Sequence, residues 1–209
     1  MNWLKRREEL VGKIGKILVK TKALRFGTFS LPSGRLSSYY IDLRMTPSLP
    51  DAFRLMVDAY IETANHVLNS DHFEVIGAVP TVGLTYAAVV AYRLAKPLLY
   101  VRGEGTRPPG AKSVEGILMP GSNVLVIDDL SMTGTSILKA AQSIRAEGGV
   151  VTDALVLIDR MEGAAKLLRT AQIRLRSFTT ILELARVLKQ MEALAEEDFQ
   201  SIRKQVNSR

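Results

Sequence analysis

The strongest constraint on the fold is a regular alternation of short apolar runs with helical patterns between residues 73 and 195. Continuous apolar strands interleaved with helices are typical of a parallel sheet covered on both faces. We therefore predict an α/β fold with a mainly parallel sheet and helices on both faces. The predicted strands are Phe73–Val79, Pro97–Arg102, Val124–Asp128, Val151–Asp159 and Ile173–Phe178. The predicted helices are Leu84–Leu94, Thr135–Ala146, Gly163–Arg169 and Ile181–Ala195.

The N-terminal part follows a different pattern. Apolar residues from Leu10 to Leu18 recur at helical spacing with lysines between them, which predicts an amphipathic helix. Two short strands, Thr28–Leu31 and Tyr39–Asp42, are expected to form a small hood, and the helix Asp51–Leu68 follows it. No linker or repeat interrupts the chain. We predict a single domain of residues 1–209, with a helix and hood in 1–45 and an α/β core and C-terminal helix in 46–209.

Composition excludes several classes of function. No apolar run approaches the roughly 18 residues of a membrane span, so no membrane partner is expected. Cysteine is absent, which excludes disulfides, thiolate nucleophiles and cysteine-based metal sites, and fits a cytoplasmic location. Residues 1–25 hold eight basic and two acidic residues of a chain with net charge +7. Nucleic acid is a conceivable partner for them, but the solvated face of a helix is the favoured interpretation.

Ligands of open α/β sheets bind beyond the carboxyl ends of the strands. Three segments follow such ends: Val79–Gly83, Arg102–Gly116 and Asp128–Ser136. The second is rich in glycine and proline, and we expect it to be mobile in the free protein. The third is the most informative.

Val124–Ser136 places two carboxylates directly before a glycine loop and a helix start. A helix start presents unpaired N–H groups and the positive end of the helix dipole, so it can bind phosphate. Asp128 and Asp129 would repel that phosphate, unless they accept hydrogen bonds from the hydroxyls of a ribose phosphate or hold a metal ion. A strand-end acidic pair beside an ordinary capped helix is the purely structural alternative. The candidate ligand-binding residues after the pair are Leu130, Ser131, Met132, Thr133, Gly134, Thr135 and Ser136.

This string resembles the binding motif for phosphoribosyl pyrophosphate (PRPP) in type I phosphoribosyltransferases, where an apolar strand, two acidic residues and a Thr-Gly step follow one another. The resemblance implies the type I phosphoribosyltransferase fold, PRPP as a ligand and Mg²⁺ as the cofactor. It also implies catalytic roles for Asp128 and Asp129. No metal ligand is assigned directly.

Residues 26–44 are similar to the orotate phosphoribosyltransferase signature F-G-x-F-x-L-x-S-G-x-x-S-x-Y-Y-x-D. Asp159-Arg160 with Glu162-Gly163 resembles the D-R-x-E-G of the same family, whose arginine helps to hold the orotate carboxylate. The resemblance implies that Arg102 contacts pyrophosphate and is catalytic. It also implies a homodimer, because one chain's loop completes the neighbouring site. The base-binding residues implied are Tyr39, Tyr40, Met132 and Arg160.

The chain departs from the family pattern in the loop after Arg102. Gly103 and Thr106 stand where lysines belong, and Pro108 stands where a histidine belongs. In the family, these lysines and this histidine stabilise the departing pyrophosphate, so their replacement here predicts weak turnover. Arg107 and Lys112 are nearby cations that offer substitutes.

Two further departures lie elsewhere. Met132 replaces a threonine beside the base, and Pro32 stands where many members have lysine. The favoured function is transfer of phosphoribose from PRPP to orotate, which gives orotidine 5'-phosphate and pyrophosphate in the biosynthesis of UMP. The alternatives are a phosphoribosyltransferase for another base and a non-catalytic relative that binds PRPP or a nucleoside monophosphate as a regulator.

Overall fold

The structure is a computed structural model that describes residues 3–30, 34, 36–68, 70–102 and 113–208. The chain divides into two compact units. One unit, the core unit, runs from Tyr60 to Phe178, and the other, the hood unit, combines Met1–Ala59 with Thr179–Arg209. No helix in the described ranges is both long and apolar enough to cross a membrane.

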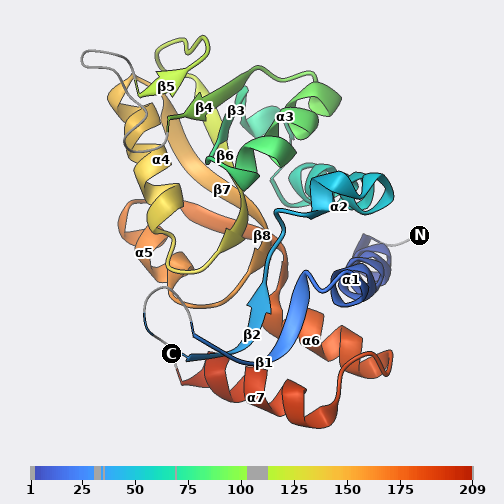
Figure 1. The fold of residues 1–209 in the computed structure, drawn as a ribbon. Coiled ribbons are helices and arrows are strands. Elements are labelled where there is room, and N and C mark those ends of the chain that lie inside the picture. The colour runs from blue at the N-terminus through green and yellow to red at the C-terminus, as the bar shows by residue number, and fades with distance from the viewer. Residues whose placement is uncertain (1–2, 31–33, 35, 69, 103–112, 209) are drawn as a thin grey trace. The chain divides into compact units, whose positions relative to one another are not determined.

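The core unit is built on a six-stranded sheet in the order β5-β4-β3-β6-β7-β8 (Figure 1). β3 is parallel to β4 and to β6, β6 is parallel to β7, and the short β5 is antiparallel to β4. This confirms the predicted mainly parallel sheet. The strands are β3 (Val75–Ala78), β4 (Leu98–Val101), β5 (Val114–Glu115), β6 (Asn123–Ser131), β7 (Val150–Asp159) and β8 (Arg174–Thr180). The helices of the core unit that follow β3 are α3 (Val82–Leu94), α4 (Thr135–Ala146) and α5 (Ala164–Thr170).

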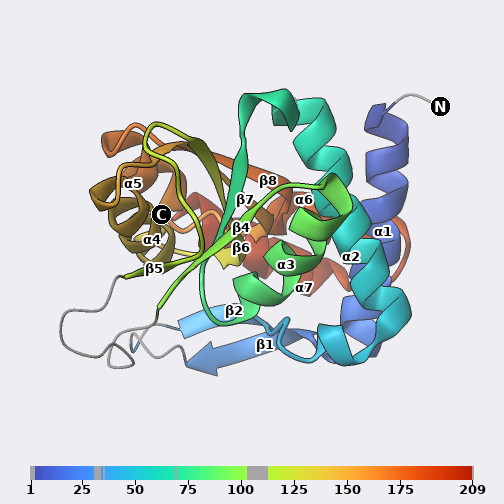
Figure 2. The same ribbon diagram turned by 90° about the horizontal axis from the view of Figure 1, so that it is seen from above.

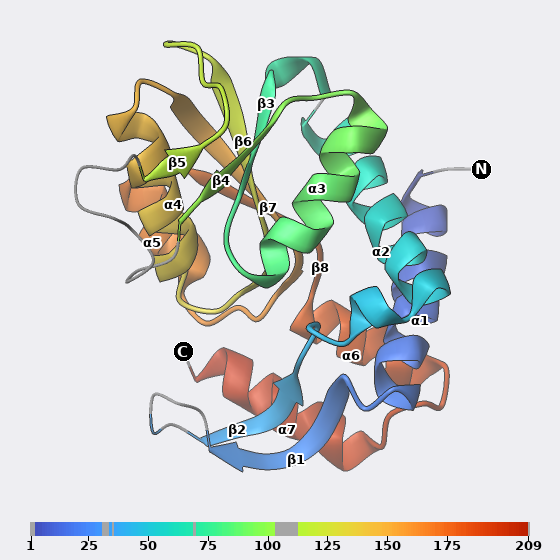
Figure 3. The same cartoon turned by 45° about the horizontal axis from the view of Figure 1, so that its top comes forward.

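Alternation along each strand divides the apolar side chains between the two faces of the sheet. Val124 and Val126 of β6 join Ile137 and Ile144 of α4 in one buried cluster. α3 packs on β3, β4 and β6, and Figure 3 shows it on the face opposite α4 and α5. Gly77 of β3 allows α4 to pack closely on the sheet, because a Cβ at this position would lie 2.7 Å from Ile144 Cδ1. Both faces are therefore covered, as predicted.

The hood unit combines segments from both ends of the chain. α1 (Trp3–Lys20) and α6 (Ile181–Gln190) pack together, and a Cβ on Gly15 of α1 would lie 2.8 Å from Leu184 Cδ1 of α6. β1 (Leu24–Ser30) and β2 (Leu36–Ile41) form an antiparallel pair, visible in Figures 1 and 2. Leu10, Val11, Ile14 and Leu18 of the apolar stripe predicted for the first helix are buried, which confirms that helix.

Several predicted boundaries were wrong. The helix predicted to reach Ala195 ends at Gln190. Glu192 adopts φ 56°, and the backbone N–H of Ala193 donates to the Leu188 carbonyl, which terminates the helix. A further helix, α7 (Glu196–Asn207), follows and packs on α6 and β2. Phe199, Ile202 and Val206 recur along it at helical spacing, and Ile202 is buried. The helix predicted for Asp51–Leu68 is α2 (Pro50–Thr63), continued by a π-helical segment, Ala64–Leu68, and a 3₁₀ turn, Ser70–His72.

Candidate active site

The two carboxylates of Asp128 and Asp129 lie within β6, three and two residues before its end. The strand was predicted to stop at Asp128, which is wrong. β7 continues to pair with β6 as far as Ser131, which lies opposite Asp159, and the Ser131 hydroxyl donates to the Asp159 carboxylate over 2.8 Å. Pairing with the neighbouring strand thus holds the acidic pair near the carboxyl end of β6.

Asp128 is buried, with 8% of its surface exposed. Burial raises the pKa of its carboxyl well above the usual range, and the neighbouring Asp129 carboxylate raises it further. Gly83, at the start of α3, permits this packing, because a Cβ there would lie 2.8 Å from Asp128 Oδ1. The backbone N–H of Asp129 donates to the same Oδ1 over 2.9 Å. Two adjacent carboxylates in this setting favour a ligand that brings hydroxyl donors or positive charge.

The helix start after the acidic pair has the geometry of a phosphate cradle. Gly134 occupies the N-cap position of α4 with φ 84°, and no side chain of the described residues caps the helix. The first N–H groups of α4 therefore remain available to an anion. Gly134 is closely packed, since a Cβ there would lie 3.1 Å from Ala164 Cα of α5. Thr133, Thr135 and Ser136 are exposed around this helix start.

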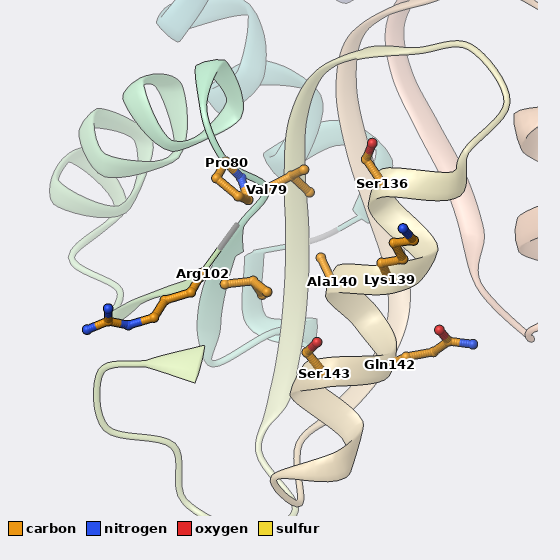
Figure 4. A pocket seen from close by; sticks show the side chains of 9 residues that line it. Val79, Pro80, Arg102, Ser136, Lys139, Ala140, Gln142 and Ser143 are labelled. Atoms are coloured by element: carbon orange, nitrogen blue, oxygen red, sulfur yellow. The ribbon is translucent and has the colours of Figure 1, made fainter. Parts of the chain in front are cut away.

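A cavity of about 500 Å³ lies between the ends of β3 and β4 and one face of α4. Figure 4 shows Val79 and Pro80 on one side and Ser136, Lys139 and Ser143 along the helix. Two cations line it, Arg102 and Lys139, and the Arg102 side chain extends away from α4 (Figure 4). The cavity thus combines positive charge, hydroxyl groups and an apolar wall.

Arg102 follows β4 and is held by β5. Its backbone N–H donates to the Ser113 carbonyl over 2.9 Å, and its Nε donates to Glu115 Oε1 over 2.5 Å. The two side chains are 36% and 34% exposed, so the pair faces solvent. Glu147, at the end of α4, accepts from the N–H groups of Ser113 and Val114 and fixes this strand.

Arg160 is held very differently. Its Nε and Nη2 donate to Glu162 Oε1 over 3.1 and 2.8 Å. The two side chains are only 6% and 3% exposed. Its backbone N–H donates to the Ser131 carbonyl over 2.9 Å, so Arg160 is tied to the end of β6 beside Met132. This buried guanidinium has a fixed position next to the predicted cradle.

Tyr39 and Tyr40 belong to β2 of the hood unit. Tyr39 is fully buried, whereas Tyr40 is partly exposed. The Tyr40 ring lies 5.8 Å from the Phe29 ring, and the Arg25 guanidinium lies 4.9 Å from its centroid. Of the two tyrosines, Tyr40 has the accessible ring.

No group of three or more histidine or acidic side chains gathers within the described ranges, so a self-contained metal cage is absent from them. Asp128 and Asp129 are the candidate ligands. Mg²⁺ is commonly bound by one or two carboxylates together with phosphate oxygens of the substrate. The acidic pair beside a phosphate cradle fits that mode of binding.

Comparison with known proteins agrees with this geometry. A family model described as "Phosphoribosyl transferase domain" matches residues 53–174. The orotate phosphoribosyltransferase of Cenarchaeum symbiosum is 42% identical over 166 residues, 79% of this chain and 83% of that protein. The chain belongs to the orotate phosphoribosyltransferase family. The matched region contains Arg102, the acidic pair, the cradle and Arg160.

Solved orotate phosphoribosyltransferases share the fold. The enzyme from Aeropyrum pernix superimposes with a TM-score of 0.71 at 38% identity, over 86% of this chain and 99% of that chain. The enzyme from Mycobacterium tuberculosis H37Rv in complex with PRPP superimposes with a TM-score of 0.66 at 25% identity, over 84% of this chain and 98% of that chain. The type I phosphoribosyltransferase fold predicted from the sequence is therefore confirmed.

Two residues near the site are not among those predicted. Lys139 lines the cavity from α4, and its spacing from Ser136 and Ser143 places all three on one helix face, a signal that the sequence contains. Tyr60 contacts the backbone of Asp128, and only the tertiary structure reveals this contact. The departures at Gly103, Thr106 and Pro108, the substitutes Arg107 and Lys112, Pro32, and most of the loop expected to be mobile lie outside the described residues.

Proposed function

We propose that this chain transfers phosphoribose from PRPP to orotate and releases pyrophosphate, as its family membership implies. The observation that carries the proposal is the acidic pair of β6 directly before the uncapped start of α4. Asp128 and Asp129 would accept hydrogen bonds from the ribose hydroxyls, and the first N–H groups of α4 would bind the 5'-phosphate with Thr133, Thr135 and Ser136. The backbone from Leu130 to Gly134 completes the PRPP site.

Displacement at the anomeric carbon builds positive charge on the sugar and negative charge on pyrophosphate. Arg102 contacts the pyrophosphate in our proposal, and Lys139 adds a second cation to the same cavity. Mg²⁺, held by Asp128 or Asp129 and by PRPP oxygens, would supply further positive charge for the leaving group. Pre-positioned charges of this kind act on the transition state more than on the bound substrate.

The base-binding residues in our proposal are Arg160 and Met132 in the core unit, and the Tyr40 ring stays a predicted contact in the hood unit. A planar guanidinium suits the carboxylate of orotate, because it can donate two parallel hydrogen bonds. Tyr39 is buried and would support Tyr40 from within the hood unit. The loop departures favour slow turnover, which Lys139 would partly offset.

Two further properties remain proposals. We expect a homodimer, because in the family a loop of one chain completes the site of the other, and a sedimentation mass of one chain at micromolar concentration would contradict it. A cytoplasmic location stays a prediction from the sequence.

Binding of PRPP tests the site separately from the reaction. Asp129→Asn combined with Thr133→Val removes a ribose contact and a phosphate contact, and each lost polar contact is worth about 1–3 kcal/mol. We expect calorimetry with PRPP and Mg²⁺ to show at least a hundredfold weaker binding. Asp71→Asn, on an exposed turn of the core unit, is the matched control. Unchanged affinity in the double variant would remove the basis of the site.

A second candidate function follows from the loop after Arg102. If PRPP binds and orotate is not consumed, the regulatory relative or a phosphoribosyltransferase for another base becomes the better description. Met132, in place of threonine, favours the second of these, because a thioether cannot form the hydrogen bonds of a hydroxyl.

A further inference from the structure

Tyr60 is a fully buried residue in the last turn of α2, and its hydroxyl joins two strands of the core sheet. The hydroxyl donates to the backbone carbonyl of Asp128 over 2.7 Å. It accepts from the backbone N–H of Leu157 over 3.1 Å. One side chain thus bridges β6 and β7 at the acidic pair.

The bridge lies where the two strands are paired in register. Asp128 lies opposite Val156, and Leu130 lies opposite Ile158. The Tyr60 hydroxyl binds the amide of Leu157, the residue that follows the partner of Asp128. A side chain from α2 therefore holds the backbone of Asp128 to β7 in addition to the pairing of the strands.

The surroundings of Tyr60 fix the hydroxyl in place. Its ring contacts the Tyr86 ring of α3 with a centroid distance of 5.5 Å, and both side chains are fully buried. Burial raises the pKa of Tyr60 well above its ordinary value, and the Asp129 carboxylate raises it further. The hydroxyl therefore keeps its proton and remains a donor to the Asp128 carbonyl.

We infer that Tyr60 is a positioning residue for PRPP, whose hydroxyl holds the backbone of Asp128 to β7 so that Asp128 and Asp129 present their carboxylates to the ribose. The inference rests on the proposed role of the acidic pair. Without the hydroxyl, the carbonyl of Asp128 and the amide of Leu157 lose their shared buried partner, and the backbone that carries both carboxylates is held less firmly. Tyr60 acts through these residues and does not itself touch the substrate.

The test compares Tyr60→Phe with Tyr92→Phe, which removes an exposed hydroxyl from α3. We expect Tyr60→Phe to weaken PRPP binding, measured by calorimetry with Mg²⁺, on the order of tenfold, as for one lost hydrogen bond to the site. The KM for PRPP should rise by a similar factor, while the KM for orotate stays within twofold. Tyr92→Phe should leave both constants unchanged. A role in folding alone would lower the amount of active protein and leave the KM for PRPP unaltered.

A second measurement on the unaltered protein covers the case in which Tyr60→Phe does not fold. The amide resonance of Leu157 should shift on titration with PRPP and Mg²⁺ and saturate at the calorimetric Kd, because this amide is linked to Asp128 through Tyr60. A constant Leu157 resonance, or a folded Tyr60→Phe variant with ordinary PRPP affinity, would overturn the inference. Neither outcome affects the proposed reaction, which fails only if the unaltered protein does not consume orotate.

Discussion

The ends of β7 and β4 each carry an arginine bound to a glutamate, and the two pairs differ in their exposure. Arg160 and Glu162 are 6% and 3% exposed, whereas Arg102 and Glu115 are 36% and 34% exposed. Removing one partner of a buried pair leaves an uncompensated charge, while an exposed pair separates at little cost. The end of β7 is therefore a fixed element, and the end of β4 is one that can exchange partners.

This difference matches the groups that we assign to each end. A base carboxylate requires a guanidinium of fixed orientation, whereas pyrophosphate must be bound and then released. A third pair, Arg7 with Glu183 in the hood unit, has an intermediate exposure of 21% and 25%. The three pairs form a series in which exposure predicts the effect of substitution.

The largest effect on stability is expected at Arg160. Arg160→Ala leaves Glu162 buried without its partner, which typically costs about 3–5 kcal/mol of unfolding free energy. Arg160→Met combined with Glu162→Leu removes both charges and should recover most of this loss while orotate binding remains impaired. Chemical denaturation measures both variants. Equal destabilisation in the single and the double variant would show that burial of the charge is not the cause.

Arg102→Ala should give the opposite result, with a large effect on rate and a small one on stability. We expect a loss of at most about 1 kcal/mol of unfolding free energy, as for a solvent-facing ion pair. The value of kcat should fall on the order of 10²–10³-fold if Arg102 stabilises the departing pyrophosphate. Arg54→Ala is the control, because Arg54 pairs with Asp51 at the surface, where the side chains are 72% and 94% exposed. An undiminished kcat in Arg102→Ala would assign the charge to another residue, Lys139 first.

The intermediate pair should produce a pH-dependent effect on stability. Burial alone would raise the pKa of Glu183, but the two hydrogen bonds from Arg7, each 2.6 Å, and that from Thr179 leave it below its ordinary value. A lowered pKa contributes stability above the unfolded-state value of about 4.3, and this contribution disappears as the pH falls through the folded-state value.

Glu183→Gln should therefore destabilise the protein by about 1.5–3 kcal/mol at pH 7, and the difference from the unaltered protein should shrink below about pH 4. Glu8→Gln is the control, since Glu8 and Arg186 connect the same two helices but are 53% and 54% exposed. Denaturant titrations between pH 3 and 7 would measure both. A difference that stays constant with pH would mean that the charge of Glu183 does not contribute.

The sequence predicted the sheet and the start of α4 because both depend on local patterns. Val124–Ser136 is a continuous strand, an acidic pair and a helix start, and its helix boundaries were confirmed at Thr135 and Ala146. The extension of β6 to Ser131 depends on pairing with β7, which adjacent residues do not encode. The burial of Arg160 and the contact of Tyr60 with Asp128 likewise arise from packing between segments far apart in the sequence.

The most direct test of the central claim is the consumption of orotate by the purified protein in the presence of PRPP and Mg²⁺, followed by the loss of orotate absorbance. We expect turnover that depends on both substrates, forms orotidine 5'-phosphate and pyrophosphate in equal amounts, and is abolished in Asp129→Asn with Thr133→Val. Turnover below the ordinary enzymatic range of about 1–10³ s⁻¹ would agree with the missing loop lysines. No orotate consumption by a protein that binds PRPP would contradict the account.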